Sequence, residues 1–133
     1  MLEAQLKEVP FFKPLGKKEL KAVAQQTDEL DVSAGKELAT EGEFGHEFFI
    51  IRSGTADVLQ NGGKIRELGP GDFFGEIALL EEDRRTATVR STSPMSVIVM
   101  TRASFRALDQ SYPGVHAEVA EAIAARRETS AAS

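Results

Sequence analysis

A glycine, a glutamate and an arginine stand close together in the stretch FGEIALLEEDRRTATV, which occupies residues 74–89. Gly75 lets the backbone pass close to another group without a side chain in the way. Residues 76–79 are good helix formers, but the chain leaves room for only about one helical turn before Asp83. The first amide groups of such a turn have no partner within it and attract anions. The stretch therefore predicts an anion site.

Two charged side chains complete this site. A carboxylate at Glu76 can accept a hydrogen bond from a hydroxyl, and an arginine on the following strand can donate two N–H groups to a phosphate. Such a charge-assisted bond contributes ~1.5–3 kcal/mol, so one arginine could change affinity about tenfold to hundredfold. Arg84 is an alternative to Arg85, because neighbours on an extended chain face opposite ways. The register with Thr86 and Ala87 favours Arg85, and phosphate beside sugar is the ligand chemistry that suits the set.

The composition limits what else the chain can do. Its 133 residues suit one domain with a single core. The absence of cysteine excludes disulfides, thiolate metal sites and thiol nucleophiles. A net charge of -5 argues against broad nucleic-acid or anionic-membrane binding, so an anionic ligand must be held locally. No apolar run has the length of a membrane span or a signal peptide, and we expect a soluble, cytoplasmic protein.

The period of the apolar residues changes twice along the chain. Three- and four-residue steps from Leu15 to Glu29 predict an amphipathic helix, which Pro10 and Pro14 separate from a shorter N-terminal helix. Residues 30–100 instead form short apolar stretches with glycines at their joints, and Asn61-Gly62-Gly63 is a strong hairpin signal. Many short strands predict an antiparallel sandwich or jelly roll.

The helical pattern returns after residue 100. Thr101 is a plausible N-cap for one helix, and Pro113 sits at the expected first turn of a last helix. We therefore expect one mainly β domain with flanking helices over residues 1–133. Its parts are N-terminal helices over 1–29, an antiparallel β-roll over 30–100, a helix pair over 101–128 and a frayed tail over 129–133.

These stretches resemble a known family. Phe74 to Leu79, followed after five residues by RTATV, is similar to the phosphate-binding cassette of cyclic-nucleotide-binding domains. Such domains are modules of cyclic-nucleotide-gated channels, the catabolite activator protein and the cyclic-nucleotide-dependent kinases. A second stretch, EGEFGHEFFIIRSG at residues 41–54, resembles the glycine turn, apolar strand and closing glycine of the same roll. The resemblance covers roughly residues 6–127.

The resemblance implies a role for each residue of the cassette, residues 74–89. Glu76 would receive the ribose 2′-hydroxyl, and Arg85 would pair with the cyclic phosphate, helped by the backbone amides near Ile77 and Ala78. Thr86 would lie near phosphate and base, where its hydroxyl could also reach the 2-amino group of a syn guanine. We expect cAMP first, with cGMP as an alternative. The implied ligand-binding residues are Gly75, Glu76, Ile77, Ala78, Arg85, Thr86 and Ala87.

The resemblance also implies that the last helix folds over the base as a lid. No aromatic residue follows Tyr112, so the cap would be aliphatic, with Val119 and Ile123, or cationic. In the cationic case Arg126 or Arg127 would lie across the purine. Val119 and Ile123 also have the plainer interpretation of core residues, which is the commoner use of such positions.

Three functions stay open. The first is a non-catalytic regulatory module, with no cofactor beyond its cyclic nucleotide, that acts on an effector domain or partner protein through movement of its C-terminal helices. The second is a same-fold protein-interaction module without ligand, against which the intact Glu76 and Arg85 count. The third is a cupin-type metal enzyme, which would need clustered histidines, whereas His46 and His116 are isolated. We expect no metal, nucleic acid or membrane contact, and a solvated acidic run at residues 81–83 that could weaken anion binding.

Overall fold

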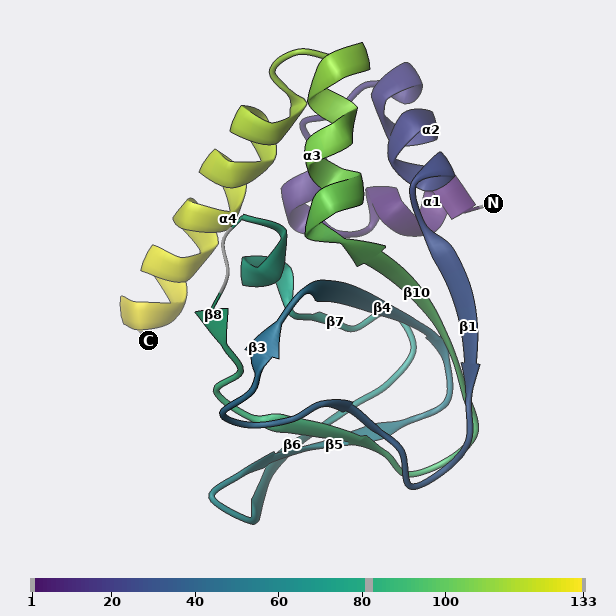
Figure 1. Ribbon diagram of the computed structural model, residues 1–133, viewed down its shortest axis with the longest axis vertical. Coiled ribbons are helices and arrows are strands. Elements are labelled where there is room, and N and C mark those ends of the chain that lie inside the picture. Colours follow the sequence, from purple (N-terminus) through teal and green to yellow (C-terminus); the bar gives the residue numbers. More distant parts are fainter. Residues whose placement is uncertain (1, 81–82, 133) are drawn as a thin grey trace. The chain divides into compact units, whose positions relative to one another are not determined.

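The computed structural model of the chain describes residues 2–80 and 83–132 (Figure 1). These residues divide into two compact units. One is a β unit formed by residues 28–102, and the other is a helical unit drawn from residues 1–27 and 103–133. The first strand begins at Asp28, two residues before the expected start of the β-roll at residue 30.

The β unit is built from short antiparallel strands. In chain order they are β1 (Asp28–Val32), β2 (Glu37–Ala39), β3 (Phe44–Gly45), β4 (Glu47–Ser53), β5 (Ala56–Gln60), β6 (Gly63–Leu68), β7 (Phe73–Phe74), β8 (Asp83–Arg84), β9 (Thr88–Ser91) and β10 (Met95–Thr101). One four-stranded sheet has the order β1-β10-β4-β7 and the other has the order β2-β9-β5-β6, while β3 pairs with β8. This arrangement confirms the predicted antiparallel β-roll with flanking helices.

Apolar side chains from both four-stranded sheets form the core of the β unit. Phe49, Ile51 and Val97 come from the first sheet, and Ala56, Val58 and Val89 come from the second. Phe74 stacks on Phe49, with ring centroids 4.8 Å apart and planes inclined by 18°. Because Gly75 follows Phe74 directly, this packing fixes the point at which the cassette begins.

The predicted hairpin between β5 and β6 is confirmed. Gln60 pairs with Gly63 across a two-residue loop, and both loop residues have positive φ, 53° at Asn61 and 81° at Gly62. Positive φ at both central positions is the geometry of the type I′ turn that Asn-Gly favours.

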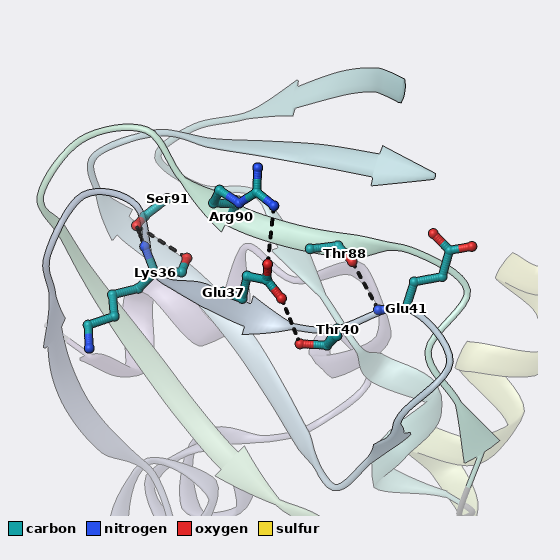
Figure 2. Close-up of polar contacts among 7 residues, drawn as sticks. All are labelled: Lys36, Glu37, Thr40, Glu41, Thr88, Arg90 and Ser91. Carbon is teal, nitrogen blue, oxygen red and sulfur yellow. Dashed lines mark hydrogen bonds and ion pairs between the residues drawn. The ribbon is translucent and has the colours of Figure 1, made fainter. Parts of the chain in front are cut away.

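A buried serine ties the start of β2 to β9 (Figure 2). The Ser91 hydroxyl donates to the Ser33 carbonyl at 2.6 Å and accepts the Lys36 N–H at 2.9 Å. One side chain therefore satisfies two backbone groups on the segment that leads into β2, as buried polar groups require.

A second set of polar contacts continues along the same strand pair (Figure 2). Arg90 donates to one Glu37 oxygen at 3.1 Å, and Thr40 donates to the other at 3.0 Å. The Arg90 bond, followed by the Thr40 bond, holds the pKa of the Glu37 carboxyl below its ordinary value. Farther on, the Glu41 N–H donates to the Thr88 hydroxyl at 3.0 Å. These bonds join β2 and the residues after it to β9, which begins three residues after the cassette arginine.

The helical unit comprises α1 (Leu2–Lys7), the 3₁₀ turn η1 (Pro10–Phe12), α2 (Lys17–Gln25), α3 (Arg102–Ser111, entered from β10) and α4 (Val115–Ala132). The Gly16 N–H donates to the Glu19 carboxylate at 2.8 Å and caps the start of α2, whose Leu20 and Val23 are buried. No helix among residues 2–80 and 83–132 is long and apolar enough to cross a bilayer.

Three predicted helix boundaries differ in the structure. The helix predicted from Leu15 to Glu29 ends at Gln25, because Asp28 already pairs with Val99 in the first sheet. The last helix begins at Val115, so Pro113 precedes its first turn. Helical backbone continues through residues 129–132, where the sequence predicts a frayed tail.

Candidate anion-binding site

A single 3₁₀ turn, η2 (Glu76–Leu79), follows β7 and confirms the helical turn predicted from the sequence. Gly75 enters it in the left-handed region, with φ 83° and ψ 18°. A β-carbon at this position would lie 2.7 Å from the Glu47 carbonyl oxygen and 2.6 Å from Arg85 Nη1. Glycine is therefore required here twice, by its backbone conformation and by the close approach of two neighbours.

The first backbone amides of η2 lie at its open end. A helical turn supplies no internal acceptor for its first N–H groups. The Ala78 N–H donates to the Gly75 carbonyl at 3.0 Å, and the Leu80 N–H donates to the Ile77 carbonyl at 3.0 Å. The amides of Ile77 and Ala78 were both expected to help hold an anion. The Ala78 amide donates within the turn, whereas the Ile77 amide lies at the open end.

Arg85 is anchored by the loop and strand around β3. Its backbone N–H donates to the Glu43 carbonyl at 2.7 Å, and its own carbonyl accepts the Gly42 N–H at 2.9 Å. Its side-chain Nη2 donates to the Glu47 carbonyl at 2.8 Å. A β-carbon at Gly45 would overlap the Nε, Cζ and Cδ atoms of Arg85. The guanidinium is thus held close to the backbone at Gly45 and Gly75.

The charge on Arg85 is partly desolvated and lies close to two carboxylates. Burial lowers the pKa of the Arg85 guanidinium, whereas the carboxylates of Glu47 and Glu76 act to raise that pKa. An arginine nevertheless stays protonated in a protein. No carboxylate of the described residues lies within ion-pairing distance of this guanidinium. The guanidinium therefore keeps N–H donors for an added anion.

Arg84 projects to a different surface. It is exposed, its Cζ lies 4.4 Å from the centroid of the Phe44 ring, and its Nη1 donates to the Gly42 carbonyl at 2.7 Å. These contacts follow from the pairing of β8 with β3 (Figure 1). In that pairing Arg84 lies opposite Phe44. The geometry favours Arg85 over Arg84 as the anion ligand.

The acidic run expected to be solvated lies outside the described residues at positions 81 and 82 and at the side chain of residue 83.

The remaining cassette residues divide between surface and core. Thr86 is exposed, and its carbonyl accepts a hydrogen bond from Gln60 Nε2 at 3.1 Å. Ala78 is buried, and Ala87 packs against the core of the β unit. Gly75, Glu76, Ile77 and Arg85 are half-buried. Gly75 and Arg85 thus lie close together, with Glu76 next in the chain after Gly75, while the methyl groups of the two alanines serve packing.

The residues predicted to cap a base lie on α4. Val119 and Ile123 are fully buried, and α4 packs against η1 within the helical unit. In this structure they are core residues. The side chains of Arg126 and Arg127 lie outside the described residues. A role for any of the four over a bound ligand stays a prediction.

Gly45 and the Glu47 carbonyl are site features that the sequence analysis does not assign. Both lie in the 41–54 stretch, which the resemblance explains only as part of the roll. A glycine within a strand often marks a place where another group approaches the backbone closely. That signal is present at Gly45, but the sequence does not say that the approaching group is the cassette arginine.

Comparison with known proteins gives the same family from sequence and structure. A family model described as the cyclic nucleotide-binding domain matches residues 29–112. The cAMP-dependent protein kinase regulatory subunits of Yarrowia lipolytica and Aspergillus niger are 36% and 34% identical to this chain over 110 residues. Both matches cover 81% of this chain but only 29% and 27% of the relatives. The chain thus spans less than a third of their length.

Two solved structures have the same architecture. The regulatory domain of Toxoplasma gondii PKA, crystallised with cAMP, matches with a TM-score of 0.73 and 34% identity over 80% of this chain and 42% of that chain. A cyclic nucleotide-binding-like protein from Brucella abortus matches with a TM-score of 0.77 and 28% identity over 82% and 97%.

Proposed function

The chain belongs to the cyclic nucleotide-binding domain family, and on that premise we propose that it binds a cyclic purine nucleotide and does no chemistry on it. The observation that carries this proposal is the geometry at Arg85. Its guanidinium is half-buried, is held close to Gly45 and Gly75, and interacts electrostatically with the Glu76 carboxylate. A partly desolvated cation beside the open start of a helical turn suits one negative group.

Each group has a separate part in this binding. Arg85 and the amide at Ile77 would hold the cyclic phosphate, and Glu76 would accept the ribose 2′-hydroxyl. The carboxylates near Arg85 also repel an anion, so a ligand must offset this repulsion through direct bonds. A cyclic nucleotide offers a phosphate to Arg85 and a ribose hydroxyl to Glu76, so it can bond to both groups. Inorganic phosphate offers no hydroxyl of a sugar to Glu76.

We favour cAMP as the ligand. The regulatory domain from Toxoplasma gondii PKA was crystallised with cAMP, and the similar kinase regulatory subunits are named as cAMP-dependent. The exposed Thr86 hydroxyl keeps cGMP as a second candidate, because it could accept from a guanine 2-amino group. A comparison of the affinities for cAMP and cGMP distinguishes the two.

We also propose that the chain is a regulatory module. Its relatives are regulatory subunits more than three times its aligned length, which suggests an effector domain or partner protein that responds to the ligand. Ligand binding would act by favouring one arrangement of the C-terminal helices over another. No group of three or more potential metal ligands occurs among the described residues.

Isothermal titration of cAMP and cGMP into wild type, Arg85→Ala and Arg84→Ala tests the proposal. Loss of a charge-assisted phosphate contact should weaken binding about tenfold to hundredfold in Arg85→Ala. Arg84→Ala removes the same charge one residue away and should bind as wild type does. Wild-type affinity in Arg85→Ala would reject the assigned site. A wild-type protein that binds neither nucleotide would favour the protein-interaction alternative.

A further inference from the structure

The first two helices of the chain form a groove that plays no part in the proposed nucleotide site. The cavity between α1 and α2 has a volume of about 330 Å³. It is lined by Glu3, Ala4, Lys7, Lys17, Leu20 and Lys21. We call it the lysine groove. Its volume falls within the range of about 300–1,000 Å³ typical of ligand pockets.

The lysine groove has an apolar floor and a cationic rim. Leu20, at 4% exposed, and the exposed Ala4 are its apolar lining residues, and Lys7, Lys17 and Lys21 are exposed around them. A lysine lays its aliphatic stem along apolar surface and keeps its ammonium in water. The three stems therefore extend the floor, and their charges stand at its edge.

The charges at this rim are available to a partner. None of Lys7, Lys17 and Lys21 lies within ion-pairing distance of a carboxylate in the described part of the chain. The electrostatic attraction between Lys21 and Glu3 is a minor influence on the Glu3 carboxyl. Three cations around one acid thus leave the groove with a positive rim.

The positive rim stands out against the charge of the chain. Residues 1–27 contain five lysines and three glutamates, a net charge of +2, whereas the whole chain carries -5. The other residues together therefore carry -7. An anionic membrane would repel that larger part, and a bounded groove presents less basic surface than a lipid plane requires. A single acidic ligand with apolar side chains fits the charge of the rim and the size of the groove better than an anionic membrane does.

We propose that the lysine groove docks an acidic amphipathic helix of a partner protein. One or two aliphatic side chains of that helix would occupy the floor over Leu20 and Ala4, and flanking carboxylates would meet Lys7, Lys17 and Lys21. Apolar anchors set in a groove and framed by opposite charges are a common mode of helix recognition. The charges would set the rate of association and the choice of partner more than the total affinity.

The test uses a fluorescent synthetic peptide of about 15 residues, with leucines at helical spacing and glutamates elsewhere, and measures its anisotropy with the full chain. Wild type should bind it, and raising the salt from about 50 to 300 mM should weaken binding because exposed charges are screened. Lys17→Glu with Lys21→Glu should weaken binding about tenfold or more. Filling the floor with Ala4→Phe should weaken it at unchanged charge.

Lys13→Glu with Lys18→Glu is the matched control, because it makes the same charge change at exposed lysines that do not line the groove. It should bind the peptide within about twofold of wild type. Circular dichroism and cAMP titration confirm that each variant is folded, and Lys17→Gln with Lys21→Gln gives a milder change if reversal disturbs α2. Equal weakening by both lysine pairs, no binding by wild type, or binding of phosphatidylserine vesicles in place of the peptide would each overturn the proposal.

Discussion

The position of the cassette arginine depends on the backbone around it more than on an acidic partner. Arg85 Nη2 bonds to the Glu47 carbonyl at 2.8 Å, while the nearby carboxylates act on it only at longer range. A carbonyl orients a guanidinium without neutralising it. The site therefore keeps a full positive charge in a defined place before any ligand arrives, which lowers the cost of organising it on binding.

The contact between Gly45 and Arg85 leads to the first prediction. Gly45→Ala places a methyl group on the Nε, Cζ and Cδ atoms of Arg85, so the guanidinium must move. We expect cyclic nucleotide affinity to fall about tenfold or more in isothermal titration, because the phosphate loses a charge-assisted bond. Gly69→Ala is the control, since its β-carbon would meet nothing within 4 Å. Equal affinity in the two variants would show that Gly45 does not position the arginine.

Thr86 provides a prediction about the base. Its side chain is exposed, so Thr86→Ala should leave folding unchanged. If the hydroxyl accepts from the guanine 2-amino group, cGMP affinity should fall about threefold to tenfold, while cAMP affinity changes less than twofold. Titrations of both nucleotides into one variant measure the difference directly. A parallel loss for both would place the hydroxyl at the phosphate, and no loss for either would remove it from the site.

Much of the site could be predicted from sequence because its key residues are adjacent along the chain. Gly75 and the turn after it follow from local backbone preferences, and Arg85 lies within the same stretch, residues 74–89. Gly45 and Glu47 could not be assigned in this way. Their contact with Arg85 depends on the pairing of β3 with β8, which joins segments about 40 residues apart. A single sequence does not show such a pairing.

Ser91 stabilises the pairing of β2 with β9, the strand that follows the cassette arginine in the chain. Its hydroxyl serves both the Ser33 carbonyl and the Lys36 N–H, and the residue is 2% exposed. Ser91→Ala leaves two backbone groups without this partner and should lower the free energy of unfolding by about 1–3 kcal/mol in urea titration. Ser33→Ala keeps its carbonyl and removes only an exposed hydroxyl, so it should be near neutral. Similar losses in both variants would contradict the assignment.

The Glu37 contacts on the same strand pair predict a dependence on pH. Arg90 and Thr40 lower the pKa of Glu37 in the folded state, so its contribution to stability is complete above the unfolded value, about 4.3. It is lost as the pH falls through the lower folded value. Glu37→Gln should therefore be less stable than wild type at pH 7, and the difference should shrink toward pH 3 in urea titrations. A difference that stays constant over this range would rule out the carboxylate as its source.

The element types were more predictable than their ends. The Asn61-Gly62 hairpin and the 3₁₀ turn after Gly75 follow from backbone preferences within a few residues. The end of α2 does not, because residues 26–29 continue a polar helical pattern in the sequence. Asp28 joins β1 because it can pair with Val99 on β10, a contact 71 positions away along the chain. Tertiary pairing thus overrides local propensity at that boundary.

Under the proposed regulatory function, the chain would report ligand binding through a change in the arrangement of its two compact units. The candidate nucleotide site lies wholly within residues 28–102, whereas α4 and the lysine groove belong to the helical unit. A ligand can shift the arrangement of the units only by as much as its affinity differs between the arrangements. At a concentration 100 times its dissociation constant, binding itself should stabilise the chain by about 2.7 kcal/mol.

Distance measurements between the units test whether their arrangement responds to the ligand. The chain has no cysteine, so Arg66→Cys and Ala117→Cys introduce two specific spin-label sites at exposed positions, one in each unit. Saturating cAMP should change the distance distribution measured by double electron–electron resonance, with a midpoint at the calorimetric dissociation constant. The same pair in Arg85→Ala should respond only at concentrations about tenfold to hundredfold higher, because the change draws its free energy from the phosphate contact. A distribution that stays the same at full occupancy would mean that the helices do not transmit binding, and the effector would then have to recognise the β unit itself.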